Sequence, residues 1–309
     1  MNYNIKIINA EEIDVEKWDA CVAKYKASIY SSYIYLNTMA DRWVGLVFNN
    51  YEAIMPICYR KKLGIKYSYT PAFIQQLGWI GNTKIGWKEV EKTILNFVSG
   101  GDIMLHHSNQ FKNINFVPKS NFIIHLNKSY QLIYENYKND LKQNLKKALK
   151  QHFTYQPNNF IHLAIDLYKT FYSNRMNKLS IKDFNNFKKL CVCLAKEKKC
   201  FIREVVNSNN DCLAIALLLK DDNRIYNLAN STTALGRKTE ANHFLLDNII
   251  KEFSNSNLIF DFEGSDLIGV KTFYIKFGAI DEPYFHWQLH KNKLDILINL
   301  IKNPSAITN

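Results

Sequence analysis

The sequence predicts an α/β protein of the α+β kind with two domains, each a mixed, largely antiparallel sheet flanked by helices. Length and composition allow two cores, because the 309 residues are 47% hydrophobic and 14% aromatic and an ordinary domain has ~100–150 residues. The same order of expected elements also occurs twice, with offsets of 158 from Trp43 to Phe201 and 155 from Ile103 to Leu258. We therefore expect an N-terminal domain of residues 1–127 and a C-terminal domain of residues 128–309.

Apolar periodicity and turn residues give the elements of the first half. Asn49-Asn50 supplies the turn of a hairpin, and Pro71 interrupts the extended stretch that follows. In order we expect helices at 15–25 and 30–40, strands at 43–48 and 53–59, extended segments at 67–69 and 75–80, a helix at 87–98, and strands at 102–106 and 121–126.

The second half repeats this order. We expect helices at 160–173 and 183–196, strands at 201–206, 213–220 and 224–229, a helix at 241–253 and a strand at 258–262. Apolar residues at helical spacing predict a last helix at 294–301 that packs back on a domain. Between the halves, 134–150 reads as one lysine-rich helix, which is either a solvated surface helix or a basic ridge beside an anionic substrate.

The net charge of +12 has two interpretations. An anionic partner such as coenzyme A, a sugar nucleotide, tRNA or anionic lipid would explain it. Compositional drift would also explain it, since 34 lysines stand against 6 arginines and specific phosphate binders tend to use the planar fork of arginine. No DNA partner is indicated.

Several function classes are excluded by missing motifs. The sequence has no P-loop, no Rossmann fingerprint, no Ser-His-Asp arrangement and no C-x-x-C or H-E-x-x-H, so we expect no metal site. No stretch approaches the ~20 apolar residues that cross a bilayer, and the acidic first 14 residues do not resemble a signal peptide. We therefore expect a cytoplasmic protein without a transmembrane segment, at most in peripheral contact with a membrane-linked substrate.

The most informative segment is 261–279. An apolar strand runs into Gly264, which tolerates unusual backbone angles, and Phe273 and Phe277 stand four apart on one face of a short helix. Tyr274 is thereby expected beside the strand end, where chemistry on open α/β sheets usually takes place. Its phenol, with a free pKa of ~10, suits protonation of a thiolate leaving group. Alternatively, the ring fills the helix–sheet interface.

Two carboxylates precede this helix. Asp261 and Glu263 alternate along one strand, so only one of them needs to face a cleft. Glu263, beside Gly264, is the better candidate for a general base, with Asp261 as the second catalytic candidate. The alternative is that Glu263 caps the following helix, a role for which Asp266 competes.

Together these features resemble the double-GNAT proteins, namely the Fem-like peptidoglycan bridge transferases and the Fem-like acetyltransferases of bacterial envelope and polysaccharide clusters. The resemblance covers nearly the whole chain and rests on 43–62, 69–78, 142–150, 236–242 and 261–279. It implies tandem GNAT-type domains, with the acceptor bound mainly by the first and the acyl-transfer groove in the second. The implied activity moves an acyl group from acyl-CoA, as co-substrate, to an amine of a cell-envelope or sugar-nucleotide precursor.

The resemblance also assigns binding residues. The splayed strand 228–231 is the expected source of oxyanion donors, and a helix start helped by basic residues is the expected phosphate site. The donor-binding candidates are Arg237, Lys238, Asn230, Ser231 and Phe273, and the acceptor-binding candidates are Lys61, Gln75 and Gln76. For the two glutamines, backbone hydrogen bonding is the alternative.

Two departures leave other functions open. The segment 235–241 matches the Q/R-x-x-G-x-G/A phosphate loop poorly, and Glu240 adds a negative charge there. Relatives that use aminoacyl-tRNA carry a Phe-Lys pair in the last helix, where this chain has Phe273-Tyr274 with Lys276 two places on. The alternatives are an aminoacyl-tRNA-dependent Fem-type peptidyltransferase and a non-catalytic GNAT-like binding module.

Overall fold

The computed structural model describes residues 5–82, 87–109, 116–172, 179–264 and 266–290. It divides into two compact units, Met1–Pro118 with Tyr284–Asn309 and Lys119–Pro283. The expected division at residue 127 treats each domain as one continuous segment, whereas the first of these units is built from both ends of the chain. The expected helix at 294–301 lies outside the described residues.

The first unit is built on one sheet with the strand order β1-β2-β3-β4-β6-β15-β7, and β5 pairs with β3. β1 with β2, β2 with β3, β3 with β4 and β5, and β6 with β15 pair antiparallel, whereas β4 pairs with β6 in parallel. The strands are β1 (Ile5–Asn9), β2 (Trp43–Phe48), β3 (Ala53–Lys62), β4 (Ile65–Ser68), β5 (Ile80–Gly81), β6 (Gly100–Leu105), β7 (Phe116–Lys119) and β15 (Tyr284–His290). The helices are α1 (Val15–Lys24), α2 (Tyr33–Met39) and α3 (Trp87–Phe97), with 3-10 turns at Ala10–Glu12 and Ile29–Ser31.

Strand β15 brings the C-terminal end of the described chain into the first sheet. It pairs with β6 from Phe285↔Leu105 to His290↔Gly100. Trp287 is 2% exposed and its ring lies 4.8 Å from that of Trp87 on α3. Burial of this indole in the core of the first unit explains why the strand returns there.

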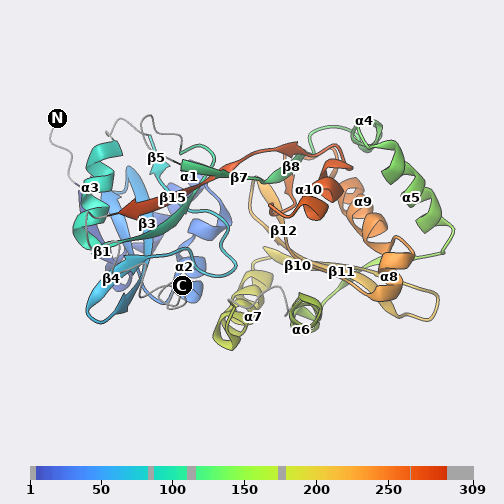
Figure 1. The fold of residues 1–309 in the computed structure, drawn as a ribbon, viewed down its shortest axis with the longest axis horizontal. Coiled ribbons are helices and arrows are strands. Elements are labelled where there is room, and N and C mark those ends of the chain that lie inside the picture. Colours follow the sequence, from blue (N-terminus) through green and yellow to red (C-terminus); the bar gives the residue numbers. More distant parts are fainter. Residues whose placement is uncertain (1–4, 83–86, 110–115, 173–178, 265, 291–309) are drawn as a thin grey trace, which may run out of the picture. The chain divides into compact units, whose positions relative to one another are not determined.

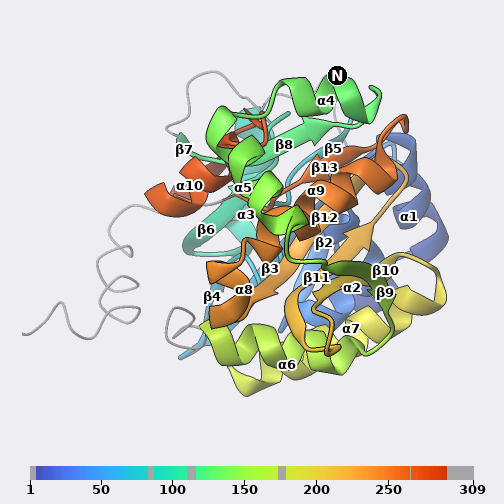
Figure 2. The same ribbon diagram turned by 90° about the vertical axis from the view of Figure 1, so that its right-hand side faces the viewer.

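The second unit has its own sheet with the order β14-β8-β13-β12-β11-β10-β9. Its strands are β8 (Phe122–His125), β9 (Thr154–Asn158), β10 (Cys200–Val206), β11 (Cys212–Lys220), β12 (Arg224–Thr232), β13 (Ile259–Asp261) and β14 (Ile280–Asp281). Its helices are α4 (Tyr130–Glu135), α5 (Asn139–Leu149), α6 (Ile161–Tyr172), α7 (Ile181–Lys196), α8 (Ala234–Lys238), α9 (Ala241–Phe253) and α10 (Ile268–Ile275). Within this unit α9 lies over one face of the sheet, and α6 and α7 lie over the other (Figure 2).

The predicted fold class is confirmed, because each unit is a mixed, largely antiparallel sheet flanked by helices. The expected helix at 241–253 has the bounds of α9. The single helix expected at 134–150 is wrong, since the structure forms α4 and α5 with a break between them. Tyr137 is buried at the break, and Lys138 is extended with its N–H bonded to the carbonyl of Lys276. Tertiary contacts therefore override the continuous helical pattern.

Candidate functional site

The site begins where two neighbouring strands of the second unit separate. β12 pairs with β13 in parallel over Arg224–Tyr226 only, after which β13 ends at Asp261. On its other side, β12 is irregular against β11, with a register shift between Leu217 and Leu219. Among the described residues, 227–232 therefore has no strand beside it on the β13 side, which leaves an edge that an extended ligand can join.

A pocket of about 550 Å³ opens at this separation. Its walls come from β12, from α8 and the start of α9, and from α10 with the loop before it. Of the residues expected from sequence to act in the site, it brings together Tyr274, Glu263, Phe273, Arg237 and Asn230. Asp261, Lys238 and Ser231 are not among its lining residues.

Tyr274 lies on α10, where it lines the pocket and also packs against neighbouring aromatic rings. Its ring is 4.6 Å from that of Phe262 and 6.2 Å from that of Phe122. The two roles weighed from the sequence, a site residue and an interface aromatic, are therefore compatible in one side chain. The ring contacts restrict where the hydroxyl can lie, which is what a positioned proton donor requires.

The turn between β13 and α10 places Glu263 on the pocket wall. Glu263 has φ +64° and Gly264 has φ +43°, a left-handed region that glycine occupies most easily. A Cβ on Gly264 would lie 2.3 Å from the carbonyl oxygen of Ser120, so this position has no room for a side chain. The N-cap residue of α10 is Leu267 rather than Glu263 or Asp266, and Asp266 instead accepts a hydrogen bond from Lys119.

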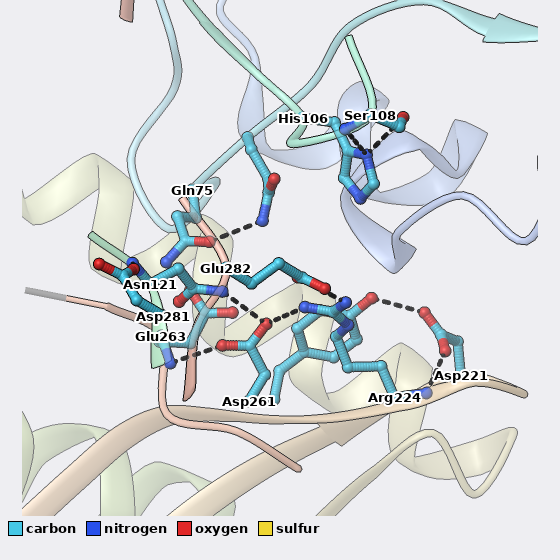
Figure 3. Close-up of polar contacts among 12 residues, drawn as sticks. Gln75, His106, Ser108, Asn121, Asp221, Arg224, Asp261, Glu263, Asp281 and Glu282 are labelled. Atoms are coloured by element: carbon cyan, nitrogen blue, oxygen red, sulfur yellow. Dashed lines mark hydrogen bonds and ion pairs between the residues drawn. The ribbon is translucent and has the colours of Figure 1, made fainter. Parts of the chain in front are cut away.

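Asp261 is held in a buried ionic network away from the pocket lining. It is fully buried, and its carboxylate accepts hydrogen bonds from Arg224, from the Asn121 amide at 3.2 Å and from the Glu263 N–H at 2.8 Å (Figure 3). Arg224 also donates to Glu282 at 2.8 Å. These bonds fix the end of β13 and the turn that presents Glu263. The expectation that alternation separates these two carboxylates is wrong, because residues two apart on a strand share a face. Instead, β13 ends at Asp261 and the left-handed turn at Glu263 and Gly264 leaves Asp261 inside and Glu263 on the pocket.

The expected phosphate loop is a helical turn in the structure. Thr233 caps α8 by accepting from the Gly236 N–H at 2.9 Å, and the N–H groups of Arg237 and Thr239 bond within the turn. A Cβ on Gly236 would lie 2.2 Å from the Leu213 carbonyl oxygen, so glycine allows α8 to pack against β11. The N–H groups of Gly236, Arg237 and Thr239 are therefore already used.

Basic side chains nevertheless lie at this corner. Arg237 lines the pocket, is exposed, and donates to the Thr232 carbonyl at 2.6 Å. Lys238 is exposed outside the lining. The start of α9 follows directly, and the N-terminus of a helix attracts anions.

Unpaired polar atoms gather around the pocket. Among the described residues, five buried side-chain atoms without a hydrogen-bond partner belong to pocket-lining Asn227, Asn230, Asn242 and His243. Asn227 is 4% exposed, and both its amide oxygen and its nitrogen lack a partner. Each such atom costs ~1–3 kcal/mol unless something bonds to it, so the cluster marks a place for a polar ligand. Ser231 Oγ is also buried without a partner, but it lies outside the lining.

Sequence reasoning missed Asn227, Asn242, His243 and Glu240 as contributors to the pocket. One local signal was available: Glu240 and His243 stand three residues apart at the start of a helix, a spacing at which two side chains can contact each other. Nothing local marks Asn227, because its burial depends on elements that are distant in sequence.

The expected acceptor residues lie in the first unit. Lys61 is exposed near the end of β3, beside a hollow of about 370 Å³ that Arg42, Arg60 and Lys62 also line. Gln76 is 2% exposed; its Nε2 donates to Gln75 Oε1 at 2.8 Å, and its Oε1 has no partner among the described residues. This bond therefore joins one side-chain amide to the other.

Neither a metal-binding cluster nor a membrane-spanning helix is found among the described residues. In the described part of the chain, no group of three or more His, Cys, Asp and Glu side chains is arranged to hold a metal ion. No helix within the described ranges combines the length and hydrophobicity that crossing a bilayer requires.

Comparison with known proteins identifies the fold. No family model and no curated protein matches the sequence. Among solved structures, FemX is similar with a TM-score of 0.67 at 12% identity over 96% of this chain and 99% of that one. The C-terminal domain of a putative lysylphosphatidylglycerol synthetase from Agrobacterium fabrum has a TM-score of 0.55 at 10% identity, covering 94% and 96%. L-PGS from Bacillus licheniformis has a TM-score of 0.57 at 11% identity, covering 93% and 96%. At such identities the similarity concerns the fold, and the chain has the tandem GNAT-type fold of the Fem-like proteins.

Proposed function

We propose that this protein is an N-acyltransferase that moves an acyl group from acyl-CoA to an amine of a cell-envelope or sugar-nucleotide precursor. One observation carries the proposal: the pocket at the separation of β12 and β13 is lined by Tyr274 and Glu263, with Arg237 at its α8 wall. A free strand edge, a hydroxyl and a carboxylate in one cavity are the groups that amide formation requires.

The free edge of β12 suits the donor. The pantetheine arm of coenzyme A carries amides, and an extended amide chain can add to a sheet edge by main-chain hydrogen bonds. Donors on the edge 227–232 can also stabilise the oxyanion that forms when an amine attacks the acyl carbonyl. The phosphates would lie toward the N-terminus of α9 and Arg237.

The two polar side chains from the 261–279 segment have complementary roles. Tyr274 protonates the leaving thiolate, because a phenol is a stronger acid than water and remains protonated at neutral pH. Glu263 holds the acceptor ammonium by charge, next to the carbonyl that it attacks. Lys61, Gln75 and Gln76, which belong to the first unit, are the proposed acceptor contacts.

An aminoacyl-tRNA donor is the second candidate, and α8 favours it. The N–H groups of Gly236, Arg237 and Thr239 are bonded inside that helical turn and do not point at a pyrophosphate. Lys142 on α5 is half-buried, whereas Lys146, Lys147 and Lys150 at the end of this helix are exposed and form a basic surface. If tRNA binds there, its affinity falls steeply with salt, by about one log unit per log unit of salt for each phosphate contacted.

Donor binding and transfer test these proposals. We expect isothermal calorimetry to detect acetyl-CoA binding to the wild-type protein, and Arg237→Ala to weaken it with little effect on turnover of bound donor. Lys189→Ala, in helix α7 and outside the pocket lining, is the matched control for loss of a positive charge. Transfer is measured with labelled acetyl-CoA and with labelled aminoacyl-tRNA against a panel of amino-sugar nucleotides. Transfer from neither donor would refute the proposed activity, and transfer from tRNA alone would replace the donor.

A further inference from the structure

A carboxylate and an imidazole face each other at the start of α9. Glu240 is the N-cap residue and makes no side-chain cap to the helix. Instead, its Oε2 lies 2.8 Å from Nδ1 of His243, with side-chain exposures of 21% and 12%. Both residues line the pocket at the β12–β13 separation.

This contact fixes the tautomer of the ring. An ionised carboxylate only accepts hydrogen bonds, so Nδ1 of His243 carries the proton that is donated to Glu240. The neutral imidazole then has its lone pair on Nε2. That nitrogen is buried and has no partner among the described residues. The ring itself is held in place by Phe273, with centroids 4.9 Å apart, and by the stacked ring of Phe277 at 6.3 Å.

The surroundings keep the imidazole neutral. Burial lowers the pKa of His243 below its ordinary value of 6.5, and the positive charge of Lys276 acts in the same direction. Glu240 and, less strongly, Asp140 act in the opposite direction. Among the described residues, the other charged groups on the pocket wall are Arg237 and Glu263. The helix N-terminus also disfavours an imidazolium, as in enzymes that use neutral histidine at such a position.

We propose that His243, oriented by Glu240, is the general base that removes the proton from the acceptor amine. The inference rests on the proposed acyl transfer and assigns its proton acceptor, a role for which the sequence alone suggested Glu263. A base needs a lone pair that no other described residue occupies, a partner that fixes its tautomer and a neutral resting state. His243 has all three, by the same logic as a carboxylate-oriented histidine in a catalytic triad.

The proton balance of the step is complete. The acceptor binds as an ammonium, and His243 Nε2 takes one proton to leave a neutral amine. The amine nitrogen forms a bond to the acyl carbon, and collapse of the tetrahedral intermediate breaks the C–S bond. Tyr274 gives its hydroxyl proton to the sulfur, and its phenolate takes the extra proton from the new amide nitrogen. The imidazolium finally releases its proton to solvent.

The protonation state of His243 is tested directly by ¹H–¹⁵N NMR of the imidazole nitrogens in the whole protein. At pH 7.5 we expect the Nδ1–H tautomer, and we expect Glu240→Gln to shift the population toward Nε2–H. His162, exposed on α6, is the internal control and should be unaffected. An Nε2–H tautomer in the wild-type protein would overturn the assignment without any assay of activity.

The kinetic test uses His243→Asn, because an asparagine amide can still donate to Glu240 from about the place of Nδ1 while Nε2 is removed. We expect kcat/KM for the acceptor to fall by ~10²–10⁴-fold, with the KM for the donor nearly unchanged and the acidic limb of the pH profile lost. Glu240→Gln should lower the rate in the same direction. His162→Asn should match the wild-type protein.

The outcomes distinguish failure of the proposed acyl transfer from failure of the proposed role of His243. A wild-type protein that transfers no acyl group refutes the proposed function. A wild-type protein that transfers, while His243→Asn keeps the acidic limb and Glu263→Gln loses it, refutes only the assignment of His243 and makes Glu263 the base.

Discussion

Asp247, on α9 behind the site, should make the stability of the second unit depend on pH. The residue is 9% exposed, and Tyr130 donates its hydroxyl to both carboxylate oxygens at 2.9 and 3.0 Å. Burial raises the pKa of Asp247 from its ordinary value of 3.8 to about 6, although Tyr130, Tyr137 and Lys251 act in the opposite direction. The charged form of this carboxylate therefore lowers the free energy of unfolding. We expect Asp247→Asn to remove this pH-dependent loss, since asparagine has a similar shape and no charge.

The size and sign of the effect follow from linkage. A shift of about two pKa units corresponds to ~3 kcal/mol, because one unit is ~1.4 kcal/mol. The folded pKa lies above the unfolded one, so the folded state binds the proton more tightly. The stabilisation is complete below pH 3.8 and is lost as the pH rises to about 6. Relative to wild type, Asp247→Asn should thus gain up to ~3 kcal/mol between pH 4 and pH 7.

The assay is urea unfolding at intervals from pH 4 to pH 7.5. The free energy of unfolding of the variant minus that of the wild type is taken at each pH, so that groups common to both cancel. Asp222→Asn, at an exposed aspartate of the same unit, is the control and should give a flat difference. A flat difference for Asp247→Asn as well would show that burial does not perturb this carboxyl, and the reasoning from its environment would fail.

Three further predictions concern the β12–β13 end of the second unit. Tyr274→Phe keeps the ring contacts and loses only the hydroxyl, so turnover should fall by ~10²–10⁴-fold with a nearly unchanged melting temperature; full activity would make Tyr274 a packing residue. Arg224→Met leaves the fully buried Asp261 without its cation, so the free energy of chemical unfolding should fall by ~3–5 kcal/mol. The double variant Arg224→Met with Asp261→Leu should recover much of this free energy. If the double variant is as unstable as the single one, the unpaired charge is not the cause. Gly264→Ala should lower the free energy of unfolding by more than ~1 kcal/mol, because Gly264 has a positive φ and a carbonyl oxygen close to the place of a Cβ. Gly269→Ala, in α10 with no atom within 4 Å of the added Cβ, should be neutral or stabilising. Equal effects of the two variants in thermal unfolding would contradict this account.

The sequence by itself determined the order of the elements and the fold class. Periods of 3.6 and 2 residues are local properties, so the helix at 241–253 and strands such as 43–48 and 201–206 could be placed without knowledge of their neighbours. Gly264 marked a turn whose backbone conformation only glycine adopts easily, and the structure has that turn. The placement of Tyr274 beside the strand end follows from the same local logic.

Tertiary structure decided which polar groups meet. Alternation could not tell whether Asp261 or Glu263 faces the pocket, because that depends on Arg224 and Asn121, which are 37 and 140 residues away from Asp261. The return of β15 to the first sheet likewise depends on long-range pairing with β6.

The pocket wall shows the same limit. Glu240 and His243 are near neighbours in sequence, yet the neutral state of the ring comes from burial and from Lys276 on another element. Asn227 lies on β12 just beyond its pairing with β13, and its buried amide has no partner among the described residues. Secondary structure follows from local periodicity. The burial, the hydrogen-bond partners and the pKa of a side chain depend instead on the residues that surround it in space, and these come from distant segments of the chain.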